Sequence, residues 1–322
     1  MLAAVARALA GGTPRGASRW ETLTRCDREY FHRYVEGIEL TKGRPGARNA
    51  NGGGFEGGTL LDATLAAYYE MKRVAGGKAP GVDAIRPHFE EILPHVGAEG
   101  ADVRTETVVW RTFERYAAWE LEAYRHWRVV AVQVPLEAVW EKGDRDVRLT
   151  AKVDLLVQDQ RDMTTIAVDN KISTAERGSV ESSYRMAPAV VTTLLCARDG
   201  FVHDGNGWPG MSEGAVLDPG GADGVTPGEA VRIHHVWINQ ILTRESPPPA
   251  RGASILVAQH VLDAYGGQVI ETDTEAALHS DTIDSWPQRG LVSGACRGWG
   301  PCEYVDLCAG GPRARGLYRK KV

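Results

Sequence analysis

Apolar and polar residues alternate between positions 129 and 171 in a way that predicts three consecutive strands. In residues 147–157 the odd positions are apolar, whereas Arg148, Thr150, Lys152 and Asp154 occupy even positions. This period of two is typical of a β-strand with one buried face. A polar turn at 159–162 separates this strand from a second alternating run at 165–171, and an apolar run at 129–137 precedes both.

Helical periods lie on both sides of these strands. Apolar residues spaced by three or four predict helices over residues 18–36, 58–74, 80–96, 109–127 and 188–197. Capping boxes at Ser18–Glu21 and Thr272–Glu275 mark the first helix and a last one over 272–286. Residues 230–242 read as a further strand. The order predicts an α/β fold in which helices flank a mixed central sheet.

The same pattern predicts one domain over residues 1–322. Its expected parts are a mainly helical segment at 1–127, a core of strands and one helix at 128–200, and a C-terminal part at 229–322. Residues 201–228 are crowded with Gly, Asp and Pro and have no period, so we expect an insertion or loop there.

Composition narrows the possible functions. A net charge of −5 excludes a uniformly basic nucleic-acid binder, so any contact with DNA must come from a local surface. No apolar run approaches the roughly 20 residues that span a bilayer, and no membrane partner is expected. Five cysteines, an odd number in a long chain, do not form a secreted disulfide framework. We therefore expect a cytoplasmic protein.

The predicted hairpin brings candidate chemistry to one surface. Its alternation places Asp154, Asp169 and Lys171 on the same side of the sheet. Two carboxylates and a main-chain carbonyl, for which Asn170 is the candidate, make an oxygen site for Mg²⁺ or Mn²⁺. Such a cation activates water and stabilises charge on a phosphodiester, and Lys171 could assist. Alternatively, these charges simply face solvent. Glu137 is either an accessory acid or a solvated strand charge.

The cysteines suggest a second site. Cys296, Cys302 and Cys308 are each separated by five residues, in a segment rich in Gly and Pro. A four-cysteine site would need either Cys26 or Cys196 as the fourth ligand. Zinc sites more often use a two-residue gap, and iron–sulfur clusters accept wider spacings. The spacing leaves iron and zinc both open, and three free thiols in a tail are the third interpretation.

Four segments together resemble a known family. They are residues 22–31 (TLTRCDREYF), Val153-Asp154, Asp169-Asn-Lys171 and residues 301–308 (PCEYVDLC). The chain resembles the PD-(D/E)xK nuclease superfamily, in particular the RecB-like branch with a four-cysteine cluster, which includes AddB-type recombination nucleases and CRISPR-adaptation exonucleases. The resemblance implies a restriction-endonuclease-like core. It also implies a [4Fe–4S] cluster, with zinc as the less favoured substitute, bound by Cys26, Cys296, Cys302 and Cys308. That cluster would join the two chain ends and leave Cys196 to core packing.

The chain departs from this family at two places. Where the family carries a His in a Gly-x-x-x-His context, Gly58-Thr-Leu-Leu-Asp62 has an aspartate. We expect Asp62 to be a metal ligand, the alternative being a charge stabilised near a helix N-terminus. The family's Gln-x-x-Tyr motif is absent near Pro188 and Val191.

The resemblance implies a metal-dependent DNA nuclease. We expect an exonuclease that acts in recombination, repair or phage-type DNA processing, with a helicase or recombination protein as a candidate partner. The alternative is a catalytically inactive subunit that keeps the fold and the cluster. The missing Gln-x-x-Tyr motif favours this alternative, and the intact Asp154, Asp169 and Lys171 argue against it.

Overall fold

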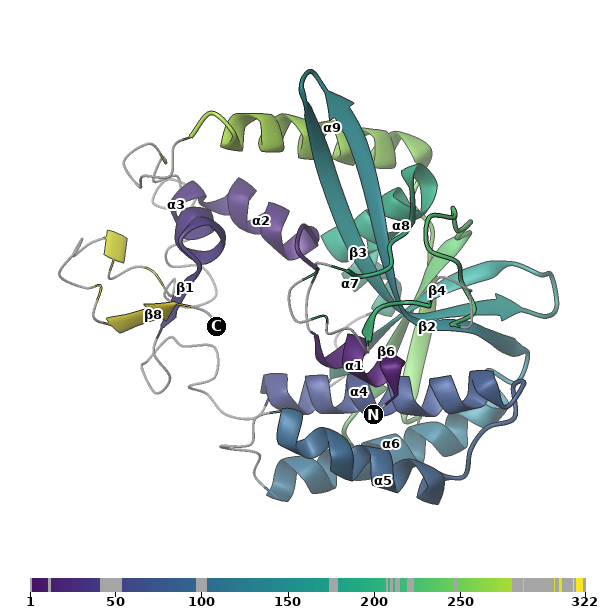
Figure 1. The fold of residues 1–322 in the computed structure, drawn as a ribbon. Coiled ribbons are helices and arrows are strands. Elements are labelled where there is room, and N and C mark those ends of the chain that lie inside the picture. The colour runs from purple at the N-terminus through teal and green to yellow at the C-terminus, as the bar shows by residue number, and fades with distance from the viewer. Residues whose placement is uncertain are drawn as a thin grey trace. The chain divides into compact units, whose positions relative to one another are not determined.

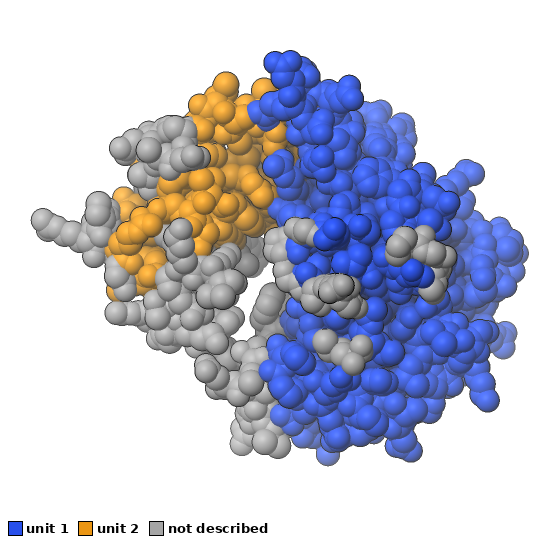
Figure 2. All heavy atoms as spheres, in the orientation of Figure 1, with its two compact units in different colours: residues 1–16, 55–264 blue, residues 17–54, 265–322 orange. Residues whose placement is uncertain are grey.

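The computed structural model describes residues 2–10, 13–40, 54–96, 103–173, 179–206, 208, 211, 215–218, 223–245, 248–279, 286, 304, 307–308, 315 and 317–320. The chain divides into two compact units, coloured blue and orange in Figure 2. The first contains residues 1–16 and 55–264, and the second contains residues 17–54 and 265–322. The single nuclease domain over residues 1–322 stays a prediction.

A mixed sheet forms the centre of the first unit, as the sequence predicts. Among the described residues six strands pair in the order β5-β2-β3-β4-β6-β7 (Figure 1). β4 and β6 are parallel, and every other neighbouring pair is antiparallel. The strands are β2 (Trp127–Lys142), β3 (Arg145–Asp159), β4 (Thr165–Ser173), β5 (Gly200–Val202), β6 (His235–Leu242) and β7 (Ala250–Ile255).

Helices of the first unit bury their apolar stripes against this sheet. α4, α5 and α6 lie next to one another in Figure 1, and α4 and α6 contribute Leu61 and Phe113 to a core shared with Leu155 and Val168. α8 lies against β2 and β3. The helices are α1 (Ala3–Leu9), α4 (Gly54–Val74), α5 (Val82–Ile92), the 3₁₀ turn η2 (Leu93–His95), α6 (Val103–Ala123), α7 (Val180–Tyr184) and α8 (Pro188–Asp199).

The second unit is built from segments near both ends of the chain. Strand β1 (Ile38–Leu40) pairs with β8 (Tyr318–Lys320) in an antiparallel two-stranded sheet. Arg315 forms an ion pair with Glu36 at 2.7 Å, and Trp286 stacks on Tyr30. The unit also contains α2 (Ala17–Arg25), α3 (Asp27–Tyr30) and the π-helix η1 (Phe31–Val35).

Three predicted helices differ from the structure. The helix predicted over 109–127 ends at Ala123, and Trp127 begins β2. The predicted helix over 18–36 breaks at Cys26, whose extended backbone (φ −162°, ψ 111°) ends α2 and begins α3. The helix predicted to start at Thr272 is wrong, because α9 (Gln259–Ala276) already includes that residue. Thr274 donates its hydroxyl to the carbonyl of Ile270 at 2.7 Å, so a residue type that often caps helices is accommodated inside one.

Candidate metal centre

The predicted site lies where two neighbouring strands separate. β3 and β4 pair from Gln158↔Thr165 to Leu155↔Val168, after which β3 continues along β2 and β4 along β6. Asp154 and Asp169 are the next residues on their strands. We call the place where β3 and β4 separate the fork. Because residues opposite each other in antiparallel strands point to the same side, both carboxylates lie on one face of the fork.

Backbone and side chain join across the fork. Oδ2 of Asp154 accepts the backbone N–H of Asn170 at 2.8 Å. The carboxylate of Asp154 therefore provides a hydrogen-bond acceptor for the backbone of Asn170, which lies past the last β4 residue paired with β3. On β4 itself, Nζ of Lys171 lies 2.7 Å from Oδ1 of Asp169, and both side chains are partly exposed. The structure thus brings Asp154, Asp169 and Lys171 together.

Asp62 reaches the same place from α4. Nε2 of Gln133 donates to both carboxylate oxygens of Asp62, at 3.1 and 3.3 Å. Gln133 lies on β2 between Val132 and Val134, whose partners on β3 are Leu155 and Val153, so it stands across from Asp154. Its φ of +53° is in the left-handed region, which non-glycine residues rarely adopt.

A second lysine faces the carboxylates. Lys152 precedes Asp154 by one strand repeat, and its Nζ donates to the carbonyl of Arg7 in the last turn of α1 at 2.8 Å. Burial lowers the pKa of Lys152, and the charges of Asp62 and Asp154 oppose that shift. The site therefore contains three acidic and two basic side chains.

The acidic groups repel one another in a partly dry environment. Burial raises the pKa of Asp62 to about 6; Asp169 adds to the shift, while Lys152 and Lys171 oppose it. Burial, together with Asp62 and Asp169, raises the pKa of Asp154 well above its usual range. Burial disfavours the ammonium of Lys171, but Asp169 and Asp154 outweigh it, and the net effect raises its pKa. Negative charge is thus in excess, which favours a bound cation.

The oxygen chemistry of the site suits a hard divalent cation. Its available ligands are the carboxylates of Asp62, Asp154 and Asp169, which Mg²⁺ and Mn²⁺ prefer. Oε1 of Gln133 is buried without a hydrogen-bond partner, so an unused oxygen acceptor adjoins Asp62. Across the parts of the chain that the structure describes, no three His, Cys, Asp or Glu side chains form a metal-ligand set as they stand. The carbonyl of Asn170 stays a predicted ligand.

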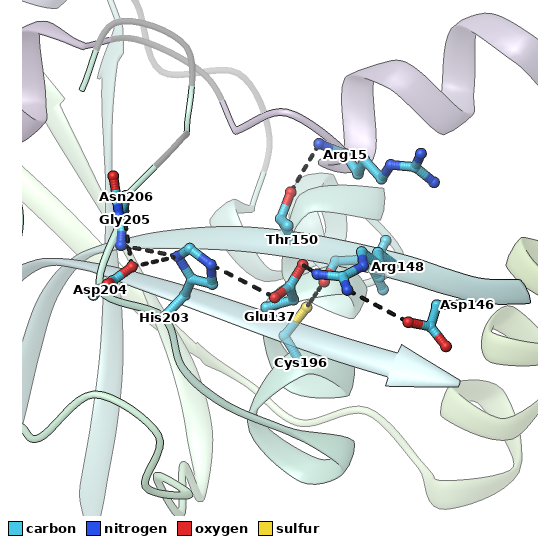
Figure 3. A network of polar contacts seen from close by, with 11 residues as sticks. Arg15, Glu137, Asp146, Arg148, Thr150, Cys196, His203, Asp204, Gly205 and Asn206 are labelled. Carbon is cyan, nitrogen blue, oxygen red and sulfur yellow. Dashed lines mark hydrogen bonds and ion pairs between the residues drawn. The ribbon is translucent and has the colours of Figure 1, made fainter. Parts of the chain in front are cut away.

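Glu137 is not brought to these carboxylates. It pairs with Thr150, four residues before Asp154 and so roughly 13 Å away along β3. Figure 3 shows the buried Glu137 side chain between Arg148, at 3.3 Å, and His203, at 3.7 Å. The structure therefore gives Glu137 a separate polar network.

Three residues of the site carry no assignment from the sequence. Lys152 is visible on the polar face of its strand, but nothing in the pattern distinguishes it from a solvated lysine. The sequence pattern does not mark Gln133, because its hydrogen bonds to Asp62 depend on an unusual backbone angle. Tyr184, the last residue of α7, lies close enough to Lys171 for its phenolate charge to raise the lysine pKa.

The cysteines are only partly described. Cys26 is buried at the N-terminus of α3, and the backbone N–H of Cys308 donates to the carbonyl of Tyr304 at 3.1 Å. Cys296 and Cys302 lie outside the described residues. Cys196 is buried in α8, and its thiol donates to the carbonyl of Leu149 at 3.5 Å. Burial raises the pKa of that thiol, as expected for a core cysteine rather than a metal ligand.

Comparison with known proteins gives a family match over most of the chain. The family model of the PD-(D/E)XK nuclease superfamily matches residues 16–309. No curated protein matches the chain. Among solved structures, the crystal structure of SSO0001 is similar at 9% sequence identity, with a TM-score of 0.28, over 66% of this chain and 83% of that one. In the described part of the chain, none of the helices has the length and apolar character needed to cross a bilayer.

The raised pKa of Asp62 makes stability without metal depend on pH. The folded protein holds a proton on Asp62 up to about pH 6, whereas the unfolded chain loses it near pH 4. The folded state thus binds more protons in this window, and its stability falls as the pH rises through it. In a chelator, Asp62→Asn should match the parent at about pH 3.5 and melt at a higher temperature at pH 7.

Asp162→Asn provides the control for this melting series. Asp162 is exposed, and hydrogen bonds from Thr164 lower its pKa, so its replacement should give no gain at pH 7. A melting difference for Asp62→Asn that is the same at both pH values would contradict the account of Asp62.

Proposed function

The chain belongs to the PD-(D/E)XK nuclease superfamily, and from that membership we propose that it hydrolyses phosphodiester bonds of DNA with Mg²⁺ or Mn²⁺. The observation that carries the proposal is the fork between β3 and β4, where Asp154, Asp169 and Lys171 meet. Asp62 adds a third carboxylate from a helix, and its negative charge supports cation binding.

Each residue has a role in this proposal. Asp154, Asp169 and Asp62 would hold the cation, which would supply activation of a water molecule and stabilisation of charge on the phosphate. The N–H of Asn170 keeps Oδ2 of Asp154 in a fixed direction. Lys171 could act either as a base or as a positive charge. Its raised pKa supports the second role, since an ammonium can orient the attacking water or meet the developing negative charge.

The finer parts of the proposal follow from the resemblance. We infer an exonuclease in the cytoplasm that acts in recombination, repair or phage-type DNA processing, with a helicase or recombination protein as candidate partner. The alternative is a catalytically inactive DNA-binding or partner subunit that keeps the fold and the cluster. DNA contacts must be local, because the net charge of −5 provides no overall attraction for DNA.

We also propose that Cys26, Cys296, Cys302 and Cys308 bind a [4Fe–4S] cluster, with zinc as the less favoured occupant. The break between α2 and α3 at Cys26 supports the proposal, because it interrupts an otherwise helical run at this one cysteine. Cys26 and Cys308 belong to the same compact unit, which is built from both chain ends. The cluster would tie these ends together without redox chemistry.

Cleavage assays test the catalytic proposal. Asp169→Asn and Lys171→Met should each lower the rate of Mg²⁺- or Mn²⁺-dependent DNA cleavage by about 100-fold or more, because each removes a group that stabilises the transition state. Asp146→Asn, which changes an exposed acid at the start of β3, should cleave at the parental rate.

These assays also decide the alternatives. If the parent binds DNA but cleaves none with either cation, the protein is the inactive subunit. Parental cleavage by Asp169→Asn and Lys171→Met would remove both residues from catalysis. If Asp62→Ala cleaves DNA at the parental rate and binds Mn²⁺ with parental affinity, Asp62 is not a metal ligand and is only a charged residue of α4.

Metal analysis tests the cluster. Protein purified without air should be brown and contain about four irons per chain. Serine at Cys26, Cys296, Cys302 or Cys308 should remove the colour and lower stability, and Cys196→Ser should keep the colour. Stoichiometric zinc without iron would overturn the iron assignment.

A further inference from the structure

A buried polar network lies behind the strand that carries Asp169 and Lys171. Its centre is Asn239 on β6, which is fully buried and is the direct register partner of Asn170 on β4. Nδ2 of Asn239 donates to Oδ1 of Asn170 at 2.9 Å and to the hydroxyl of Tyr116 at 2.7 Å. Its Oδ1 accepts the hydroxyl of Tyr124 at 3.3 Å. The amide thus uses both of its N–H groups and its oxygen.

The network extends into the helices that cover the sheet. The hydroxyl of Tyr116, on α6, lies 2.6 Å from that of Tyr69, on α4. The hydroxyl of Tyr124 also accepts Nε1–H of Trp237 at 3.0 Å. Polar groups from α4, α6, β6 and β4 are therefore held in one connected set. A connected and satisfied buried network fixes its members more rigidly than apolar packing does.

This network ends at the centre of the candidate site. Asn170 separates Asp169 from Lys171, and successive side chains of a strand point to opposite faces. The side chain of Asn170 is held by Asn239, while its backbone N–H binds Asp154. Any rotation of Asn170 would therefore move Asp169 and Lys171 and weaken the bond to Asp154 at the same time.

We propose that Asn239 is a positioning residue for the nuclease site: it fixes Asn170, and through it the directions of Asp154, Asp169 and Lys171. The proposal rests on the proposed nuclease function for its effect on rate. Its structural part, that Asn239 holds Asn170 in place, is independent of that function. An apolar residue of the same size at 239 would leave the hydroxyls of Tyr116 and Tyr124 and the amide of Asn170 without this partner.

The test compares Asn239→Leu with a matched control. Tyr68→Phe also removes a buried tyrosine hydrogen bond, to Glu120 at 2.9 Å, on the same helix as Tyr69 but outside the network. Four quantities are measured in both: melting temperature, Mn²⁺ affinity by electron paramagnetic resonance, kcat and KM for DNA cleavage, and hydrogen exchange of the β4 amides.

For Asn239→Leu we expect kcat and Mn²⁺ affinity to fall by about 10- to 100-fold, with KM for DNA changed less than about twofold. Exchange at Asn170 should become faster. Tyr68→Phe should lose stability but keep parental kcat, Mn²⁺ affinity and exchange at Asn170. Tyr116→Phe, which removes one of the three bonds of Asn239, should shift the same quantities in the same direction by a smaller factor.

Parental kcat, Mn²⁺ affinity and Asn170 exchange in folded Asn239→Leu would overturn the proposal. If Asn239→Leu does not fold, the double variant Tyr116→Phe/Tyr124→Phe decides in the same way. If the parent protein cleaves no DNA, the proposed nuclease function is wrong, but the positioning role of Asn239 is not thereby contradicted. In that case, faster exchange at Asn170 in Asn239→Leu still supports the positioning role, and unchanged exchange overturns it.

Discussion

The hydrogen bond between Asp154 and the backbone of Asn170 joins the two strands at the place where they part. Two neighbouring strands that separate leave backbone donors and acceptors without their ladder partners, and such groups are costly when they are partly buried. Here the carboxylate of Asp154 takes the donor of Asn170. This one hydrogen bond therefore links β3 to β4 where they separate, and it places the carboxylate of Asp154 opposite Asp169. The network behind β4 holds Asn170 from its other side.

Charge then determines what this fork can bind. Three carboxylates are partly withdrawn from water, and Lys152 and Lys171 balance only part of their charge. Burial is the largest cause of the raised pKa values of Asp62 and Asp154, and repulsion from the neighbouring carboxylates adds to it. A divalent cation would relieve this repulsion, in the same way that the lysines relieve it in part. The same excess of negative charge that disfavours the metal-free state thus favours Mg²⁺ or Mn²⁺.

The sheet and its acidic hairpin can be predicted from the sequence because both follow from a period of two. That alternation places Asp154, Asp169 and Lys171 on one face, and the helical period places Asp62 at the edge of an apolar stripe. The role of Gln133 depends on a left-handed backbone angle, and that of Asn239 on a pairing between distant strands. Neither has a local signature. The last helix is mispredicted because a capping pattern also occurs inside a helix, where Thr274 donates its hydroxyl to the backbone carbonyl of Ile270.

Anomalous diffraction from crystals containing Mn²⁺ tests the central claim most directly, since it locates the ion without reference to activity. The account predicts one strong manganese peak at the fork, distinct from the iron of the proposed cluster and within about 2.0–2.6 Å of carboxylate oxygens of Asp154 and Asp169. It also predicts that Asp154→Asn crystals lose this peak. A manganese peak elsewhere in the protein, with Lys171 still bound to Asp169 at an empty fork, would contradict it.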